Sequence, residues 1–337
     1  MGVYESVTTP PCRYTTTTHR SSAMRCCGSS MVPSGVLLLV LSLRSVGALQ
    51  ASRLSASSSV SLRSAALRSD DYLSSLQPST SSVAQEAVVD KGEVSESLWH
   101  ASLSYFAVDK LRPKGPRANA DVGRPCDATR PLGTTGATAA GSWWCAAGGW
   151  PSPKQRTTTE IFHVFSGHGC LTDVDGQRHY FGPGDTVVLP KGWSGRWDVM
   201  EDIHKVWFVH DHPSVLETAD PIRAKITHHQ DLLSVADSPG GAHPDRQFPA
   251  TASRAIYDVG PTVRVGTWTC TPGSFPAKLK PETAVGFFVL DGLFFLTDAD
   301  GSKAHRCTKG DTVLLPKGWT GHWDVIRPVS KLWVAVE

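Results

Sequence analysis

One sixteen-residue stretch occurs twice in this chain of 337 residues. Residues 184–199 read GDTVVLPKGWSGRWDV and residues 310–325 read GDTVLLPKGWTGHWDV, with thirteen identical positions. A repeat of this identity at a fixed period of about 125 residues indicates an internal duplication. The chain is therefore expected to fold as two copies of one domain, and its function has to be interpreted from both copies together.

Both copies have the sequence pattern of antiparallel β-structure. Short runs rich in Val, Phe, Trp and Thr alternate with turn signals such as Asp175-Gly176 and residues 182–185. Helical periodicity is absent, so we predict an all-β fold with one small barrel over residues 98–212 and a second over residues 251–337. The first barrel is expected to carry an extended N-terminal arm that covers a sheet edge. Residues 213–250 are expected to connect the barrels.

The first 69 residues have the composition of a targeting leader, and residues 70–97 that of a disordered linker. Residues 31–48 are signal-like, because their apolar run has the length of a signal-peptide core and is too short to span a bilayer. Residues 51–69 are transit-like, with eight Ser, three Arg and no acid. This order is similar to the two-part plastid leaders of algae, so we predict a plastid protein with no transmembrane segment after processing. A mitochondrial or secretory destination is the alternative.

Charge and cysteine content exclude several classes of protein. The chain carries a net charge of +2, but residues 1–69 hold seven Arg and one Glu, so the remainder is mildly acidic. An acidic body argues against a nucleic-acid partner. The cysteines after the leader are odd in number and lack CxxC spacing, which disfavours a disulfide scaffold or structural zinc. We therefore expect buried, inert thiols at Cys126, Cys145, Cys170, Cys270 and Cys307.

The spacing of glycine and proline in both copies resembles the two cupin motifs. Residues 184–192 follow the second motif, G-x5-P-x-G, and residues 148–167 have the spacing of the first. The PKGWSG-x-WDV ending is similar to the cupin family that includes ureidoglycine aminohydrolase-like and ethanolamine-utilisation-like cupins. The resemblance covers about residues 105–337. It implies a bicupin, which is a chain with two tandem jelly-roll barrels, and a homodimer that forms through sheet edges.

The resemblance also identifies where a metal would bind. Metal-binding cupins use two His and one Glu from the first motif and a third His from the second. The corresponding residues in the first copy are Lys154, Arg156, Glu160 and Gly195. Those in the second copy are Leu279, Pro281, Val285 and Gly321. A single carboxylate beside cations is not a four-ligand site, so we predict no metal cofactor. The alternative is one divalent Mn, Fe, Ni or Zn ion, and His163, His179 and His204 are expected to be structural.

The first copy nevertheless retains polar residues in this region. Strand alternation places one set of side chains on a single face, namely Arg156, Thr158, Glu160 and Phe162, with Lys154 close by. If that face points inward, these residues form a pocket for a small polar molecule. An Arg–Glu pair that only closes the barrel is the other interpretation. The same face is apolar in the second copy, which predicts a structural barrel.

Two further residue types recur in both copies. We expect the repeated tryptophans to pack in the cores, namely Trp193, Trp197 and Trp207 with Trp319, Trp323 and Trp333. Each copy also retains one lysine. We expect Lys205 to pair with Asp198, and Lys331 to pair with Asp324.

Two functions are compatible with these observations. The first is a bicupin that binds a small polar molecule in its first barrel. The alternative is a cupin hydrolase or isomerase acting on a small ureido, amide or sugar-like substrate. In that enzyme Glu160 would be a general base or the sole carboxylate ligand, and Arg156 would hold substrate charge. The sequence leaves open whether the chain is an enzyme, because a fold alone does not decide function.

Overall fold

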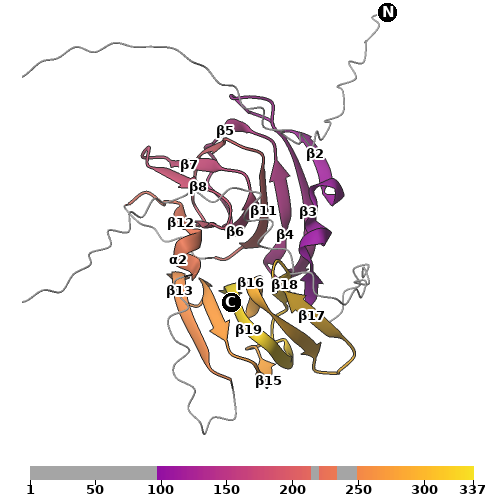
Figure 1. The fold of residues 1–337 in the computed structure, drawn as a ribbon. Helices are drawn as coiled ribbons and strands as arrows, with labels where there is room; N and C mark the ends of the chain where they lie inside the picture. Colours follow the sequence, from indigo (N-terminus) through magenta and orange to yellow (C-terminus); the bar gives the residue numbers. More distant parts are fainter. Residues whose placement is uncertain (1–96, 214–219, 234–248) are drawn as a thin grey trace, which may run out of the picture. The chain divides into compact units, whose positions relative to one another are not determined.

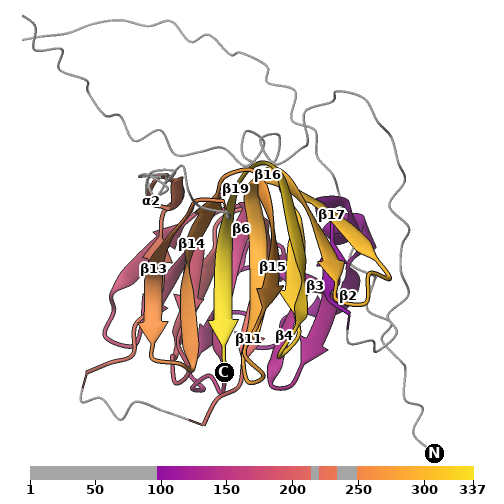
Figure 2. The same ribbon diagram turned by 90° about the horizontal axis from the view of Figure 1, so that it is seen from below.

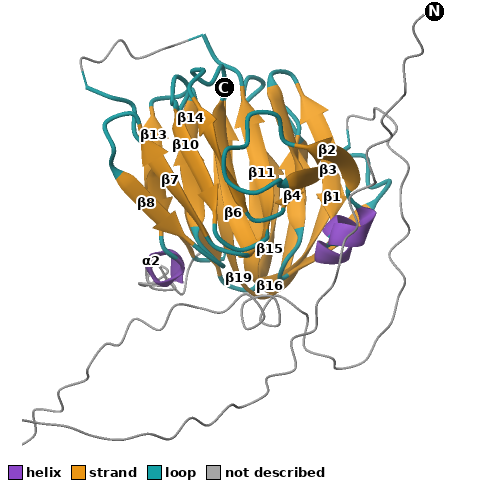
Figure 3. Ribbon diagram, turned by 90° about the horizontal axis from the view of Figure 1, so that it is seen from above, coloured by secondary structure: helices purple, strands orange, loops and turns teal. Residues whose placement is uncertain are grey.

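The computed structural model describes residues 97–213, 220–233 and 249–337. The predicted leader, its plastid address and the linker lie outside the described residues. Most of the described chain forms strands (Figure 3). Helical structure there consists of two 3-10 turns, η1 (Leu103–Phe106) and η2 (Val108–Lys110), and the short helix α2 (His229–Leu233). None of these helices is long and apolar enough to cross a membrane. The predicted all-β fold is confirmed.

The first barrel consists of two antiparallel sheets. One has the strand order β12-β9-β6-β11-β4-β3-β2 and the other has the order β5-β10-β7-β8. Their bounds are β2 (Arg112–Pro116), β3 (Cys126–Thr135), β4 (Thr138–Cys145), β5 (Gly148–Ser152), β6 (Thr159–Ser166), β7 (Gly169–Asp173), β8 (Arg178–Phe181), β9 (Thr186–Leu189), β10 (Gly195–Val199), β11 (Ile203–His210) and β12 (Lys225–Thr227). The core between them contains Phe162, Val164, Leu171, Trp193 and Trp197.

The second barrel repeats the order of strands along the chain, but its strands join into one continuous sheet, in which β16 and β19 are longer than their counterparts (Figure 2). Its strands are β13 (Thr251–Val259), β14 (Val263–Cys270), β15 (Gly273–Lys278), β16 (Ala284–Asp298), β17 (Ala304–Thr308), β18 (Thr312–Leu315) and β19 (Thr320–Val336). Strand β16 covers the positions of β6 and β7, and β19 covers those of β10 and β11. Register shifts between Val289 and Phe294 interrupt the pairing of β16 with β19, and such irregularities let one strand bend between two layers. Phe287, Phe294 and Trp323 lie in its core.

Each barrel is extended by a strand from outside its own repeat (Figure 1). Strand β1 (Trp99–Ala101) precedes the first barrel, but it pairs with β18 of the second barrel. Strand β12, from the connection, pairs with β9 of the first barrel. Both contacts include a histidine and the aspartate of the repeated GDT motif. His100 Nε2 lies 3.0 Å from Asp311 Oδ2, and His228 Nδ1 lies 3.1 Å from Asp185 Oδ2. Residues 99–101, expected in the first domain, therefore belong to the sheet of the second.

The arm that follows β1 completes the first barrel. Strand β2 pairs with β3 and becomes the last strand of its sheet. Pro113 and Pro116 fit this edge position, because proline cannot donate a hydrogen bond to a further strand. The arm therefore covers the edge of β3, as predicted, and it brings the side chains of residues 112–117 to one end of the barrel.

A shared core cluster contains side chains from both barrels. Phe165 and Phe208 of the first barrel belong to it together with Phe288 and Leu332 of the second. The His163 ring lies 4.5 Å from the Phe288 ring, measured between centroids. His163 thus points away from the barrel interior, because residues 160 and 163 lie on opposite faces of the strand. Its face of β6 contacts the second barrel, whereas the opposite face, with Glu160, points into the first.

The cysteines agree with the prediction at four of five positions. Cys145, Cys170, Cys270 and Cys307 are buried free thiols. Cys126 is half-buried and disulfide-bonded, which corrects the expectation for that residue.

Candidate functional site

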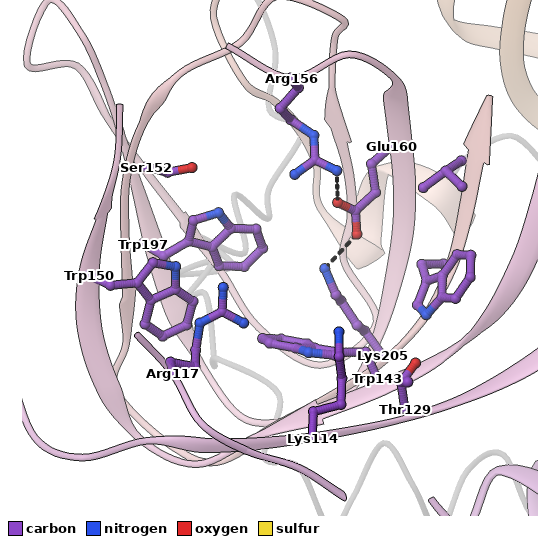
Figure 4. Close-up of a pocket in the computed structure, with 12 residues that line it drawn as sticks. Lys114, Arg117, Thr129, Trp143, Trp150, Ser152, Arg156, Glu160, Trp197 and Lys205 are labelled. Atoms are coloured by element: carbon purple, nitrogen blue, oxygen red, sulfur yellow. Dashed lines mark hydrogen bonds and ion pairs between the residues drawn. The ribbon is translucent and has the colours of Figure 1, made fainter. Parts of the chain in front are cut away.

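A pocket of about 310 Å³ lies in the first barrel, at the end that the arm covers (Figure 4). Five strands of the two sheets, β3, β4, β5, β10 and β11, contribute aromatic or hydroxyl side chains, and the arm contributes two cations. The lining residues are Lys114, Arg117, Thr129, Trp143, Trp150, Ser152, Arg156, Glu160, Trp197, Lys205, Trp207 and Val209. The pocket therefore combines four cationic side chains, one carboxylate and four indole rings.

The carboxylate of Glu160 is held by two cations. Lys205 Nζ lies 2.8 Å from Glu160 Oε1, and Arg156 Nη2 lies 2.5 Å from Glu160 Oε2 (Figure 4). Glu160 and Lys205 are buried, with exposed fractions of 8% and 3%. The Lys205 pairing corrects the predicted partner Asp198, which instead accepts from Arg196 Nε at 2.8 Å. Both oxygens of the only acidic side chain in the pocket lining are thus engaged.

The charges of this group fix its protonation state. Burial by itself raises the pKa of Glu160, but Lys205 and Arg156 outweigh it and lower that pKa to about 2. Burial lowers the pKa of Lys205, and the Glu160 carboxylate opposes this change. Lys205 Nζ also lies 3.7 Å from the centre of the Phe162 ring and 4.7 Å from that of Trp197, which favours the ammonium form. Glu160 is therefore ionised at neutral pH.

Two further cations come from the arm. Arg117 Nη1 donates to Asp127 Oδ2 at 2.7 Å, and its guanidinium lies 4.2 Å from the centre of the Trp150 ring. Trp143 Nε1 donates to the same Asp127 oxygen at 3.0 Å. Lys114 lies on β2 and extends into the pocket beside Trp143 (Figure 4). Neither Lys114 nor Arg117 is predicted as a site residue from the sequence, although both belong to the basic run KLRPKGPR at 110–117, which lies in the arm.

Of the predicted site residues, Arg156 and Glu160 line the pocket, and Phe162 lies fully buried beneath Lys205. Thr158 is half-buried and Lys154 is exposed, and neither lines the pocket. The reason is that β6 begins at Thr159, so strand alternation does not extend to residues 153–158. Arg156 is positioned by its own backbone, whose N–H donates to the Trp193 carbonyl at 2.9 Å.

The repeated tryptophans have two roles. Trp193 and Trp319 are core residues, as predicted, and their indole N–H groups donate at 2.7 Å to Asp173 and Asp298. Trp197 and Trp207 line the pocket as well. The repetition of these tryptophans in both copies predicts core packing, but it gives no sign that they also line a pocket in the first barrel.

The residues present do not fit the metal that the resemblance implies. In the described part of the chain, no three His, Cys, Asp or Glu side chains lie close enough to hold an ion. Gly195 stands at the third histidine position, where a Cβ would lie 2.2 Å from the Thr172 carbonyl oxygen. An imidazole there would require β7 to move. Both Glu160 oxygens already contact cations, namely Arg156 and Lys205. The positive charge in this site therefore comes from side chains, whereas in a metal-binding cupin it comes from the ion.

The three histidines considered as substitutes for the missing ligands are structural. Burial lowers the pKa of His163 to about 3 and that of His204 to about 4. His204 contacts Ser142 Oγ at 2.8 Å, and His163 contacts Thr186 Oγ1 at 3.0 Å. His179 lies 2.6 Å from Asp173. None of the three lines the pocket.

The second barrel retains the lysine but not the acid. Lys331 corresponds to Lys205, and Val285 replaces Glu160. Lys331 Nζ lies 4.2–4.5 Å from the ring centres of Trp268, Phe287 and Trp323. Among the described residues no carboxylate lies within ion-pair distance of it, which corrects the predicted pairing with Asp324. Burial lowers the pKa of Lys331 to about 7. Val285 and Phe287, on the face predicted to be apolar, pack with the core side chains of this barrel.

Comparisons with known proteins agree with this fold. The family model of the EutQ-like cupin domain matches the sequence twice, at residues 132–207 and 260–333. A protein named as glyoxylate-induced, from Pseudomonas aeruginosa, is 15% identical with a TM-score of 0.52, and the match covers 74% of this chain and 93% of that one. Salicylate 1,2-dioxygenase from Pseudoaminobacter salicylatoxidans is 14% identical with a TM-score of 0.51, covering 71% and 81%. No curated protein matches the chain significantly. At these identities the likeness concerns the fold alone.

Proposed function

Because the chain contains two cupin domains, we propose that its first barrel binds a small organic anion through fixed side-chain charges and without a metal ion. The observation that carries this proposal is the lining of the pocket, where four cations face one carboxylate. A pocket that binds a small molecule typically combines apolar walls with a few polar groups that fix orientation. Here the walls are indole rings, and the polar groups are predominantly cationic.

The arrangement of the cations suits a carboxylate. Arg156 presents a planar guanidinium whose Nε is buried without a hydrogen-bond partner in the described structure. A guanidinium donates two parallel hydrogen bonds to a carboxylate more readily than an ammonium does. Lys205 is held in place by Glu160 and three aromatic rings. These side chains are therefore ordered before the ligand arrives, which reduces the entropy lost on binding.

The alternative function, a hydrolase or isomerase with Glu160 as general base, is less well supported. A general base works best when its pKa lies near the operating pH. The pKa of Glu160 is about 2, and both of its oxygens contact cations. These contacts favour a positioning role for Glu160, in which the carboxylate orients Lys205 and Arg156.

Binding of simple anions to the full-length chain tests the proposal. Isothermal titration with benzoate and inorganic phosphate should give saturable binding, accompanied by a change in tryptophan fluorescence. Arg156→Gln should weaken binding on the order of 10-fold, because one charge-assisted contact is lost. Lys154→Gln is the matched control, since Lys154 is an exposed cation in the same loop, and it should leave the affinity unchanged. Absence of binding to any anion, or a stoichiometric metal that is lost in Glu160→Gln, would refute the proposal.

Two predictions from the sequence remain proposals. Delivery to a plastid is supported by the composition of residues 1–69, and a fusion of that segment to a fluorescent protein would test it. A homodimer through sheet edges is supported by the resemblance, and the molar mass in solution would test it.

A further inference from the structure

We infer that the anion bound in the first barrel is a small dicarboxylate, with one carboxylate held by Arg156 and Lys205 and the other by Lys114 and Arg117. This inference rests on the proposed function and specifies the class of its ligand. It follows from how the cations are distributed and from which of them already have a partner.

The four cations belong to two separate groups. Arg156 and Lys205 come from the barrel itself and are joined through Glu160. Lys114 and Arg117 come from the arm, and no ion pair within the described chain links them to the first group. In Figure 4 the ring of Trp197 lies between Arg156 and Arg117. A ligand that reaches both groups must therefore carry its charges at two places.

Each group has one positive charge in excess. In the barrel group, two cations share the single carboxylate of Glu160. In the arm group, Arg117 is balanced by the buried Asp127 at 2.7 Å, whereas no ion pair to a described residue involves Lys114. Two negative charges complement the pocket, and a monoanion would leave one cation without a counter-charge. Lys114 is exposed, so water screens its charge in part, and a second carboxylate beside Lys114 and Arg117 adds a moderate increment to the affinity.

The space between the two groups suits a short organic spacer. Trp143, Trp150 and Trp197 provide flat apolar surface along the pocket, and Ser152 and Thr129 provide hydroxyl groups at its sides. A volume of about 310 Å³ lies at the lower end of small-molecule sites. A phosphate monoester concentrates both charges on one group, so it would leave either the arm or the barrel cations unpaired. A dicarboxylate meets both.

Matched ligands on the full-length chain test the inference. Isothermal titration would compare succinate, glutarate and adipate with the monomethyl ester of each, and phenyl phosphate would serve as the single-group dianion. At least one diacid should bind on the order of 10-fold more tightly than its own monoester. Lys114→Met should weaken diacid binding several-fold more than monoester binding, and should thereby remove most of this preference. Arg112→Met, an exposed cation of the same strand that does not line the pocket, is the matched control.

The outcomes separate this inference from the proposed function. If diacids and monoesters bind equally well to the unmodified chain, the dicarboxylate inference is wrong while anion binding stands. If phenyl phosphate alone binds tightly, a single doubly charged group is the ligand and the inference is again wrong. If the diacid preference persists in both Lys114→Met and the charge reversal Lys114→Glu, Lys114 does not bind the second carboxylate and the inference is wrong. If no anion binds at all, the proposed function itself fails.

Discussion

The same substitution in the two barrels should have opposite effects on stability. Lys331→Met is expected to stabilise the protein at pH 7, whereas Lys205→Met is expected to destabilise it. The two lysines occupy equivalent positions and both are buried among aromatic rings. The difference that decides the sign is the acidic partner, because Glu160 accompanies Lys205 and Val285 accompanies Lys331.

The magnitude for Lys331 follows from its environment. Its pKa is about 7 in the folded protein, against an ordinary value of 10.5. At pH 7 the unfolded chain is protonated and the folded chain only half so, which corresponds to a cost on the order of 4 kcal/mol. Three rings within 4.5 Å return about 2 kcal/mol to the ammonium through cation–π attraction. Desolvation therefore wins, and Lys331→Met should gain about 2 kcal/mol.

The sign of the pH dependence follows from the same shift. Because the folded pKa of Lys331 is below the unfolded one, the unfolded chain binds more protons between pH 7 and 10.5. The stability of the unmodified protein should therefore rise with pH across this window. The advantage of Lys331→Met should shrink over the same window, since deprotonation removes the penalty.

Lys205→Met removes a partner from a buried ion pair. Glu160 keeps Arg156 but loses the cation that lowers its pKa most. Breaking a buried pair costs about 3–5 kcal/mol when the remaining charge has no other partner, so about 2–3 kcal/mol is expected here. Urea unfolding followed by tryptophan fluorescence at pH 7 and pH 9.5 would measure both variants. Changes of the same sign in Lys205→Met and Lys331→Met would refute the reasoning.

Two further predictions concern Glu160 and Gly195. The pKa of Glu160 is about 2, against an ordinary value of 4.5, and this shift contributes about 3 kcal/mol of stability above pH 4.5. That stability is lost as the pH falls towards 2, so Glu160→Gln should make the free energy of unfolding less dependent on pH in this range. An unchanged acid transition would contradict the ion pair. Gly195→His should destabilise by about 3 kcal/mol or more, because its Cβ would lie 2.2 Å from the Thr172 carbonyl oxygen. Gly176→Ala, in an open turn, should cost only about 1 kcal/mol, and equal losses of melting temperature in the two variants would argue against the clash.

The fold could be predicted because the repeat carries its own turn chemistry. Gly184 and Gly192 both have positive φ, at 84° and 88°, and Pro190 ends β9, so the repeated motif specifies the same strand and flanking turns twice. The pairing of β1 with the second barrel could not be predicted. Residues 99–101 carry no mark that distinguishes pairing with β9 from pairing with β18, and the choice depends on how the two barrels pack.

The candidate site was predicted only in part, for a similar reason. Arg156 and Glu160 are four residues apart in sequence, so a local pattern brought them together. Lys205 is 45 residues from Glu160, and its partner depends on the pairing of β6 with β11. Lys114 and Arg117 reach the pocket only because β2 pairs with β3 at the far edge of the sheet. Contacts between distant strands are set by tertiary pairing, which residue type alone does not reveal.

The pairing of β1 with β18 has a consequence for the order in which the protein can be made. His100 and Asp311 are 211 residues apart, so the segment that leads into the arm has no strand to pair with until β18 has left the ribosome. The first barrel can form its sheets earlier, but the cations of the arm are anchored on both sides only after the second barrel exists. The second barrel thus contributes to the binding site of the first, because it holds the segment that leads into the arm.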